Sequence, residues 1–407
     1  MFAPRLRPIA QVVPIHVPGR RAFISTIITK VQEKDSLHEG NHFAPIPKRG
    51  LIEIEGPDTT KYLQGLITNH MPLISAGGDG FYTAFLTPQG RMLYDAFIYP
   101  VNVGVNFPHP KFMIELPATA TEQMFKHLKR YILRSKVKLR DVSDEFNAFS
   151  VWGNIHQHNE EEENKVPVGS LVKKNKRVSD IGCIDPRVPD FGYRAIVPQN
   201  EGYYYYYYYY YYYYYFLTNI NDNWGELDLD IGAILSQVGD FKELSSEEYT
   251  IRRILNGIPE GIEDMWPEQS LPLESNFDYM NGVDFRKGCY VGQELTIRTY
   301  HTGVVRKRIL PVQLYEKDES VPTTLSVDRG KTYSTNIEPQ MDIKISGSSS
   351  KRGVGKTCSG IHNIGLALMR LEQVEKCATG EDIAFEVPET NIRVKPFLPK
   401  WWPVETQ

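Results

Sequence analysis

The side chains best suited to chemistry lie together in one short segment, KGCYVGQE, at residues 287–294. The thiol of Cys289 follows the cation of Lys287 by two residues, and side chains at that spacing share one face of an extended chain. A nearby cation favours the thiolate, which is the form of cysteine that attacks electrophiles and binds metals. Gly288 and Gly292 allow the backbone to turn or to approach a partner closely. The segment therefore indicates a reactive or metal-binding thiol.

Neighbouring polar residues offer this thiol further partners. Gln293 supplies an amide and Glu294 a carboxylate, and His301 supplies a base if it lies within hydrogen-bonding reach of Cys289. A solitary cysteine is also a common small apolar side chain of protein cores. From the residues alone, Cys289 is open to both interpretations.

The four cysteines of the chain follow no recognisable metal or disulfide pattern. They are Cys183, Cys289, Cys358 and Cys377, and neither a C-x-x-C pair nor a His/Cys pairing occurs among them. This scatter argues against a structural zinc site and against a disulfide framework.

Residues 353–357, GVGKT, are similar to the end of a phosphate-binding loop, but Ser350 stands where the first glycine of that motif belongs. The flanking residues favour short strands instead of a strand followed by a helix. We therefore expect a polar turn of a β-structure there and no nucleotide hydrolysis.

Size and composition are those of a globular protein with two or three domains. The chain has 407 residues, of which 41% are hydrophobic. Its net charge of −4 does not indicate a nucleic-acid-binding protein. Residues 1–32 differ, because they contain basic residues but no acidic residue, which is typical of a mitochondrial transit peptide. We expect residues 1–40 to be a transit peptide and polar lead-in, and the mature protein to reside in the mitochondrial matrix.

An unbroken run of tyrosines occupies residues 203–215, within an uncharged stretch that is long enough to span a bilayer. Tyrosine hydroxyls need hydrogen-bond partners, and tyrosine favours membrane interfaces over the hydrocarbon centre. We interpret the run as an insertion in a loop, without a membrane span and without a function.

Hydrophobic patterning divides the remaining chain into an α+β body and an all-β tail. In the body, strands are expected at residues 51–54, 81–86, 92–99, 137–142 and 148–152. Helices are expected to begin at Asp58 and at two capping boxes, Thr119–Glu122 and Ser245–Glu248. Beyond residue 304 only short strands are expected, at residues 304–314, 341–345, 365–371, 383–387 and 391–395. Short strands of this kind fit a small β-barrel.

The KGCYVGQE segment resembles the K-G-C-Y-x-G-Q-E signature of the YgfZ/GcvT-like superfamily of folate-binding-fold proteins. Other segments resemble the superfamily in the same order along the chain: Gly56-Pro57-Asp58, residues 63–69, Thr87-Pro88-Gln89-Gly90-Arg91, Asp185-Pro186-Arg187, residues 253–259, residues 271–285 and Gly365-Leu366-Ala367-Leu368. The continuation from Leu295 to Arg308 is similar to the mitochondrial, CAF17-like branch, whose members help to assemble four-iron four-sulfur clusters. The resemblance covers residues 44–395, except for the tyrosine run and parts of residues 315–350.

This resemblance implies a GcvT-like folate-binding-fold body at residues 41–303 and a C-terminal antiparallel β-barrel and tail at residues 304–407. It implies an accessory factor that matures mitochondrial four-iron four-sulfur proteins, namely aconitase-type enzymes and lipoate and biotin synthases. The implied partners are A-type iron–sulfur carriers and the recipient apoproteins, with no nucleic acid and no membrane span.

Cys289 is the central site residue that the resemblance implies. The supporting residues of the motif are Lys287, Gly288, Tyr290, Gly292, Gln293, Glu294 and Arg298. Iron–sulfur clusters are held by cysteine thiolates, and one exposed cysteine needs thiolates from a partner to complete such a site. We therefore expect Cys289 either to ligate a transient cluster shared with a carrier or to act as a redox thiol on the partner's cluster.

The sister enzymes of the superfamily, tetrahydrofolate-dependent aminomethyltransferases, define the alternative function. They lack a cysteine at the position of Cys289, and they carry R-E where this chain has Gln293-Glu294. They also carry an acidic pair where this chain reads Tyr94-Asp95. We therefore assign no catalytic residue. Asp95 is a candidate for a folate pocket, and binding of tetrahydrofolate or folate without turnover stays open.

Overall fold

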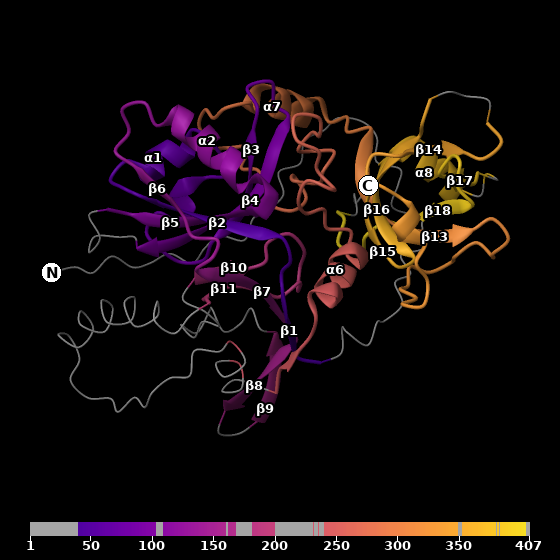
Figure 1. Cartoon of the computed structure of the whole chain (residues 1–407), viewed down its shortest axis with the longest axis horizontal. Helices are drawn as coiled ribbons and strands as arrows, with labels where there is room; N and C mark the ends of the chain where they lie inside the picture. The colour runs from indigo at the N-terminus through magenta and orange to yellow at the C-terminus, as the bar shows by residue number, and fades with distance from the viewer. Residues whose placement is uncertain are drawn as a thin grey trace.

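The computed structural model describes residues 40–102, 109–159, 162–167, 181–199, 231, 235, 240–348, 352–379, 381 and 383–403. Most of the predicted transit peptide and the whole tyrosine run lie outside these residues. In the described part, two five-stranded sheets form the body and a closed barrel follows toward the C-terminus (Figure 1). The arrangement confirms the expected α+β body with a C-terminal antiparallel β-barrel.

The first sheet has the strand order β3-β4-β5-β2-β6 and is antiparallel. Its strands are β2 (Arg49–Glu55), β3 (Phe81–Leu86), β4 (Met92–Asn102), β5 (Lys111–Pro117) and β6 (Lys138–Asp141). Helices α1 (Thr59–Gln64) and α2 (Thr121–Tyr131) contribute Leu63, Met124 and Leu128 to the apolar core that this sheet shares with them. The Tyr62 hydroxyl donates a hydrogen bond to the Leu128 carbonyl (2.5 Å), which joins α1 to the α2 segment.

The second sheet has the order β10-β11-β7-β1-β12. Its strands are β1 (His42–Pro45), β7 (Phe146–Trp152), β10 (Ile181–Ile184), β11 (Tyr193–Pro198) and β12 (Lys242–Glu243). Only the β1–β12 pair is parallel among its described pairings. Strands β8 (Asn154–Asn159) and β9 (Glu162–Pro167) form a separate hairpin.

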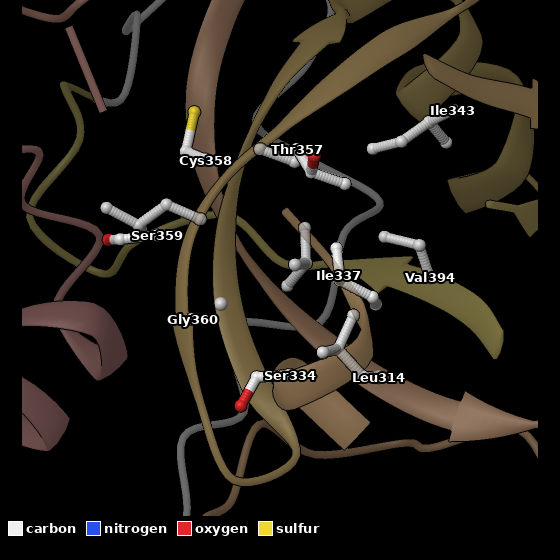
Figure 2. A pocket seen from close by; sticks show the side chains of 13 residues that line it. Leu314, Ser334, Ile337, Ile343, Thr357, Cys358, Ser359, Gly360 and Val394 are labelled. Atoms are coloured by element: carbon white, nitrogen blue, oxygen red, sulfur yellow. The ribbon is translucent and has the colours of Figure 1, made fainter. Parts of the chain in front are cut away.

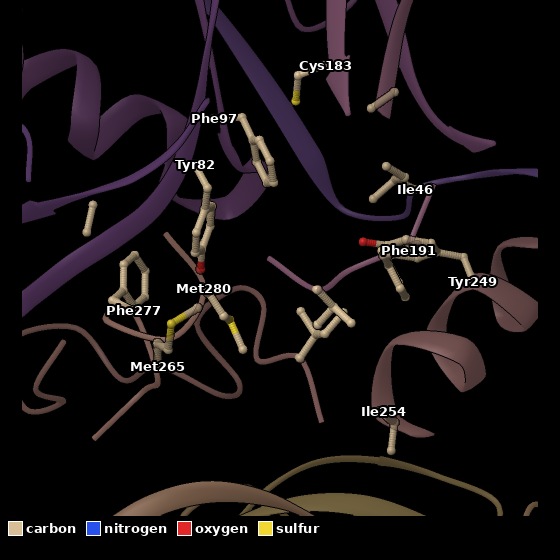
Figure 3. Packing of buried hydrophobic residues seen from close by; sticks show 14 of the residues in the cluster. Ile46, Tyr82, Phe97, Cys183, Phe191, Tyr249, Ile254, Met265, Phe277 and Met280 are labelled. Carbon is tan, nitrogen blue, oxygen red and sulfur yellow. The ribbon is translucent and has the colours of Figure 1, made fainter. Parts of the chain in front are cut away.

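The largest apolar cluster joins the two sheets to helix α6 (Ser246–Leu255) and to the loops that follow it. Figure 3 shows Tyr82 and Phe97 of the first sheet, Cys183 of β10, Tyr249 and Ile254 of α6, and Phe277 and Met280 of a later loop. The rings of Tyr82 and Phe277 stack at 4.7 Å between centroids. Burying one such large apolar side chain stabilises a fold by about 1.5–3 kcal/mol, so this cluster holds residues 260–290 against the body.

The barrel is filled by side chains. Its strands are β13 (Lys307–Glu316), β14 (Asp342–Ile345), β15 (Gly355–Ile361), β16 (Ile364–Arg370), β17 (Phe385–Glu386) and β18 (Ile392–Pro396). The interior cavity in Figure 2, lined by Leu314, Ile343 and Val394 among others, measures about 10 Å³. That volume is enough for about one water molecule, so this cavity is no ligand site.

One ion-paired cluster joins the barrel to the body. Arg253 of α6 donates to the carboxylate of Asp264 (2.6 Å) and to the hydroxyl of Ser359 in β15 (3.0 Å). The same carboxylate accepts the backbone N–H of Ser359 (2.8 Å). All three residues are buried, so the barrel is docked through satisfied polar groups as well as through apolar contact.

Several local predictions were wrong. Helix α8 (Leu371–Ala378) interrupts the region where only strands were expected, and Gly355, Lys356 and Thr357 lie in β15 instead of a turn. A 3-10 turn at Ala118–Ala120 precedes α2, so the helix begins at Thr121 without a side-chain cap.

The starts of α1 and α6 were predicted correctly, but Asp58 and Ser245 make no side-chain capping bond to their helices. Asp58 is the N-cap residue of α1, yet its carboxylate accepts the Lys136 backbone N–H (2.6 Å). Ser245 is the N-cap residue of α6 without a side-chain capping bond, and Glu248 pairs with Arg329 (2.6 Å). Tertiary contacts have replaced the local capping bonds. The remaining 3-10 turns are Met71–Leu73 and Tyr333–Asn336.

Candidate functional site

The KGCYVGQE segment forms a loop that leads into helix α7 (Gln293–Thr302). Cys289 is exposed in this loop, whereas Cys183 and Cys358 are buried and Cys377 is half-buried. The interpretation of Cys289 as a core residue therefore does not apply. Of the four thiols, this one is the most accessible to a large partner.

Lys287 fastens the loop to the end of α1. Its half-buried ammonium donates hydrogen bonds to the carbonyls of Gln64 (2.8 Å) and Ile67 (2.5 Å) and lies 4.7 Å from the centre of the Tyr290 ring. Burial lowers the pKa of Lys287 to about 7, and the nearby Asp284 carboxylate opposes this shift. Within the described residues, no hydrogen bond joins Lys287 to Cys289, so its contacts are those of an anchor.

The turn at Thr87–Arg91 holds the other side of the loop. Gly292 adopts a left-handed φ of +80°, and a Cβ there would lie 2.3 Å from the Thr87 carbonyl oxygen. Gly90 also has φ of +80°, and a Cβ there would lie 2.8 Å from the Gly292 carbonyl oxygen. The two motifs therefore pack backbone against backbone. The packing explains why both carry glycine at the contact.

Tyr290 and Gln293 complete the attachment. Tyr290 is buried, and burial raises the pKa of its hydroxyl to about 12. The Gln293 side-chain oxygen accepts the backbone N–H of Tyr290 (3.2 Å), and the Val291 N–H donates to the carbonyl of Gly65 (3.0 Å). The residues after Cys289 are thus tied to α1 and to α7.

The remaining motif residues face outward. Gly288, Glu294 and Arg298 are exposed, and a Cβ at Gly288 would meet nothing within 4 Å. His301 lies in the last turn of α7 next to Tyr300, whose ring stacks on Phe285 of the loop before Cys289. Among the described residues no hydrogen bond joins His301 to Cys289, so the structure does not pair them as base and thiol. The site is therefore an exposed Gly288–Cys289 tip on a loop whose other residues hold it to the body.

Asp95 lies in a different place from the thiol, inside the body. Its buried carboxylate accepts hydrogen bonds from Arg49 (3.2 Å) and from the backbone N–H of Gly261 (3.1 Å). Burial raises the pKa of Asp95, and Arg49 opposes that shift. The fold therefore uses Asp95 as a member of a buried ionic network.

The rest of this network was not predicted. Arg194 donates to both carboxylate oxygens of Glu115 (2.5 and 2.8 Å), and Arg187 pairs with Asp185 (2.7 Å) and Glu260 (2.7 Å). Burial opposes ionisation of Glu115, but the two guanidinium groups of Arg194 and Arg49 lower its pKa to about 2. The segment Asp185-Pro186-Arg187 was noticed in the sequence, but nothing there indicated that Arg187 pairs with Glu260 or that Arg194 pairs with Glu115.

Two polar atoms of this region have no hydrogen-bond partner among the described residues. They are the Tyr82 hydroxyl and the Nη2 atom of Arg49, and both side chains are nine-tenths or more buried. Burial and the charge of Asp95 raise the pKa of Tyr82, which places the hydroxyl in the field of that carboxylate. Unpaired buried polar atoms are costly, so native proteins usually satisfy them. Among the described residues, these two atoms are hydrogen-bonding groups without a partner beside the buried charges around Asp95.

In the described residues, no group of three or more His, Cys, Asp or Glu side chains is placed to hold a metal ion. The search of those same residues for a helix long and apolar enough to cross a membrane also found none.

The fold is that of the GcvT proteins. The chain is similar in structure to the glycine cleavage system aminomethyltransferase T from Bartonella henselae, with a TM-score of 0.54 at 12% identity, over 94% of this chain and 93% of that one. Residues 29–155 match the GCVT N-terminal domain, and residues 306–404 match the C-terminal β-barrel domain of CAF17. These matches confirm the GcvT-like fold with its C-terminal barrel.

Sequence similarity is more specific. The chain is 37% identical to the mitochondrial iron–sulfur cluster assembly factor IBA57 homolog of Neosartorya fischeri, over 88% of this chain and 81% of that protein. It is 40% identical to the Aspergillus clavatus homolog of the same name, over 86% of this chain and 75% of that protein. The chain therefore belongs to the family of mitochondrial IBA57-type iron–sulfur cluster assembly factors, which confirms the predicted family and mitochondrial location.

Proposed function

We propose that this protein matures mitochondrial four-iron four-sulfur proteins in the matrix together with A-type carriers. Aconitase-type enzymes and lipoate and biotin synthases are the recipients. The observation that carries the proposal is the exposed thiol of Cys289 on a loop that is held to the body on both sides. A thiol in such a position meets a protein partner without a rearrangement of the fold.

In this proposal the cluster is cargo, and Cys289 is one of its ligands during transfer. Cysteine thiolates hold iron–sulfur clusters, and the carrier supplies the remaining thiolates. Gly288 next to the thiol adds no side chain, so a partner's backbone can approach the exposed tip closely. Lys287 positions the loop that carries Cys289, because its ammonium donates to the carbonyls of Gln64 and Ile67.

The test is Cys289→Ser in cells that lack the protein. A serine hydroxyl is a hard oxygen donor and a poor replacement for thiolate toward iron. We expect the variant to melt close to wild type and to leave aconitase inactive. Full recovery of aconitase activity by a stable Cys289→Ser protein would refute the proposal.

Cys377→Ser is the matched control, because Cys377 is the other cysteine that is not fully buried. Its thiol donates to the Ile383 carbonyl (3.4 Å) and accepts from Lys395 (3.5 Å), and a hydroxyl can make both bonds. This variant is expected to restore aconitase activity. Cys183 is a poorer control, since it is fully buried and a buried hydroxyl without a partner costs about 1–3 kcal/mol.

A folate-type ligand is a second candidate, and it would occupy the buried polar region around Asp95. The two unpaired atoms there, the Tyr82 hydroxyl and Arg49 Nη2, carry this proposal. Tetrahydrofolate is expected to raise the melting temperature of the wild type, because a ligand stabilises the state that it binds. Tyr82→Phe removes only an unpaired hydroxyl, so it is expected to fold normally and to show a smaller shift. Equal shifts in the two proteins would argue against ligand binding at Tyr82.

Aminomethyl transfer remains the alternative activity. Tyr94 stands where the enzymes carry an acid, and its hydroxyl donates to Gln123 (2.6 Å). We expect the purified protein to release no ammonia from an aminomethylated lipoyl carrier in the presence of tetrahydrofolate. Turnover of roughly 1 per second or more, the usual enzyme scale, would establish the enzyme instead.

A further inference from the structure

A groove of about 780 Å³ lies beside the KGCYVGQE loop. It is lined by Asp58, Lys61, Tyr62, Gly65 and Leu66 of α1 and its flanks, by Tyr131, Leu133, Arg134 and Ser135 at the end of α2, and by Val291 of the loop itself. We call these residues, together with Arg130, the groove face. Three segments that are distant in the sequence thus meet at one surface.

Leu133 is the first unusual feature of the groove face. It follows the C-cap residue of α2, adopts a left-handed φ of +44°, and is 89% exposed. Glycine is the residue that this position after a helix normally takes, because other residues pay a steric cost there. The fold therefore gains nothing from leucine at 133, either in conformation or in burial. An apolar side chain held outward at a local cost indicates contact with a partner.

Charge is the second unusual feature. Residues 123–140 contain seven Lys and Arg and no Asp or Glu, in a chain whose net charge is −4. Lys126 pairs with Glu122 and Arg140 with Glu53 and Glu145, but Arg130, Arg134 and Lys136 are exposed without an ion pair among the described residues. The carboxylate of Asp58 accepts the backbone N–H of Lys136. A patch of one sign steers partners of the opposite sign toward it.

The groove face continues into the proposed cluster site. Val291 lines the groove two residues after Cys289, and its N–H is bound to the Gly65 carbonyl at 3.0 Å. A protein seated in the groove would therefore lie beside the exposed thiol. The partner that must approach Cys289 is the cluster carrier.

We propose that the groove face docks an acidic surface of the cluster carrier, with Leu133 as the apolar anchor and Lys61, Arg130 and Arg134 as the charged rim. This inference rests on the proposed function, because it names where the partner of Cys289 binds. The carrier surface must offer carboxylates and an apolar recess that accepts one leucine side chain.

The test measures association of the full-length mature protein with the apo form of the A-type carrier, at low and at high salt. Arg130→Glu combined with Arg134→Glu is expected to slow association at least about tenfold at low salt, since complementary charge acts mainly on the association rate. The difference should shrink as salt screens the charges. Lys242→Glu, which reverses an exposed charge on β12 of the other sheet, is the control and should leave the rate unchanged.

Leu133→Gly separates docking from folding. Glycine is the better residue for the backbone at 133, so the variant should melt at or above the wild-type temperature. It removes the anchor, and we expect the affinity for the carrier to fall about fivefold or more, the loss that marks the minority of interface side chains whose truncation matters. Equal affinity of Leu133→Gly and wild type would overturn the role of Leu133.

The outcomes also separate this inference from the proposed function. If the charge variant and Leu133→Gly bind the carrier and form the shared cluster like wild type, the groove face is not the docking site, and the proposed function is unaffected. If Cys289→Ser binds the carrier as wild type does but forms no shared cluster, both are supported. If wild type does not bind the carrier at all, both fail. If the protein binds cardiolipin-containing vesicles in a charge-dependent way but does not bind the carrier, the groove face binds a membrane surface. That result would overturn the inference.

Discussion

Replacing Gly292 by alanine tests how the loop that carries Cys289 is held. Gly292 has φ of +80°, and left-handed backbone costs a non-glycine residue about 1–2 kcal/mol. The added Cβ would also lie 2.3 Å from the Thr87 carbonyl oxygen and 2.9 Å from the Leu86 Cβ, so the loop and the turn must move apart. We therefore expect Gly292→Ala to lower the free energy of unfolding by at least about 2 kcal/mol.

Urea unfolding followed by tryptophan fluorescence measures this loss, and thermal melting should fall by roughly 4–8 °C if the body unfolds as one unit of 150–250 residues. Gly288→Ala is the control in the same loop, because its Cβ meets nothing within 4 Å and its φ is not left-handed. That variant should stay within about 0.5 kcal/mol of wild type. If Gly292→Ala is as stable as Gly288→Ala, the loop is not held by the contact between Gly90 and Gly292.

Two further predictions concern buried charges. Arg194→Met should lower the free energy of unfolding by about 3–5 kcal/mol, because it leaves the buried Glu115 without its closest cation; a loss below about 1 kcal/mol in urea unfolding would contradict this account of the network. The pKa of Lys287 is lowered to about 7, so between about pH 7 and its ordinary value of about 10.4 the unfolded chain holds a proton that the folded chain has released. Stability should therefore rise with pH in that window, by at most about 1.4 kcal/mol per pH unit. Lys287→Met should lack this rise, and parallel pH curves for the two proteins would contradict the assignment.

The strands of the body were predictable because burial imposes a visible pattern on them. Residues 51–54 and 81–86 lie inside β2 and β3, and the turn before Arg91 falls between β3 and β4 as expected. Helix α8 was missed because it is a short element between barrel strands, with Val374 as its buried residue. The segment around Thr119 failed as a capping box because a 3-10 turn took its place.

For the site, the sequence indicated which residues matter but not what each one contacts. Cys289 was singled out from its neighbours, and its exposure could not be known before the fold. Lys287 was expected to act on the thiol, yet its ammonium reaches the carbonyls of Gln64 and Ile67, more than 200 positions away in the chain. Leu133 has no sequence signal, because only the backbone conformation shows that glycine would fit better there.

We have proposed that Cys289 shares a cluster with a carrier. Anaerobic mixing of the mature protein with the cluster-loaded A-type carrier, followed by visible absorption and native mass measurement, tests it most directly. We expect wild type and Cys377→Ser to form a heterodimer whose mass includes one iron–sulfur cluster, with a changed visible spectrum. We expect no cluster-containing heterodimer for Cys289→Ser. The same cluster-containing heterodimer with Cys289→Ser would contradict the claim.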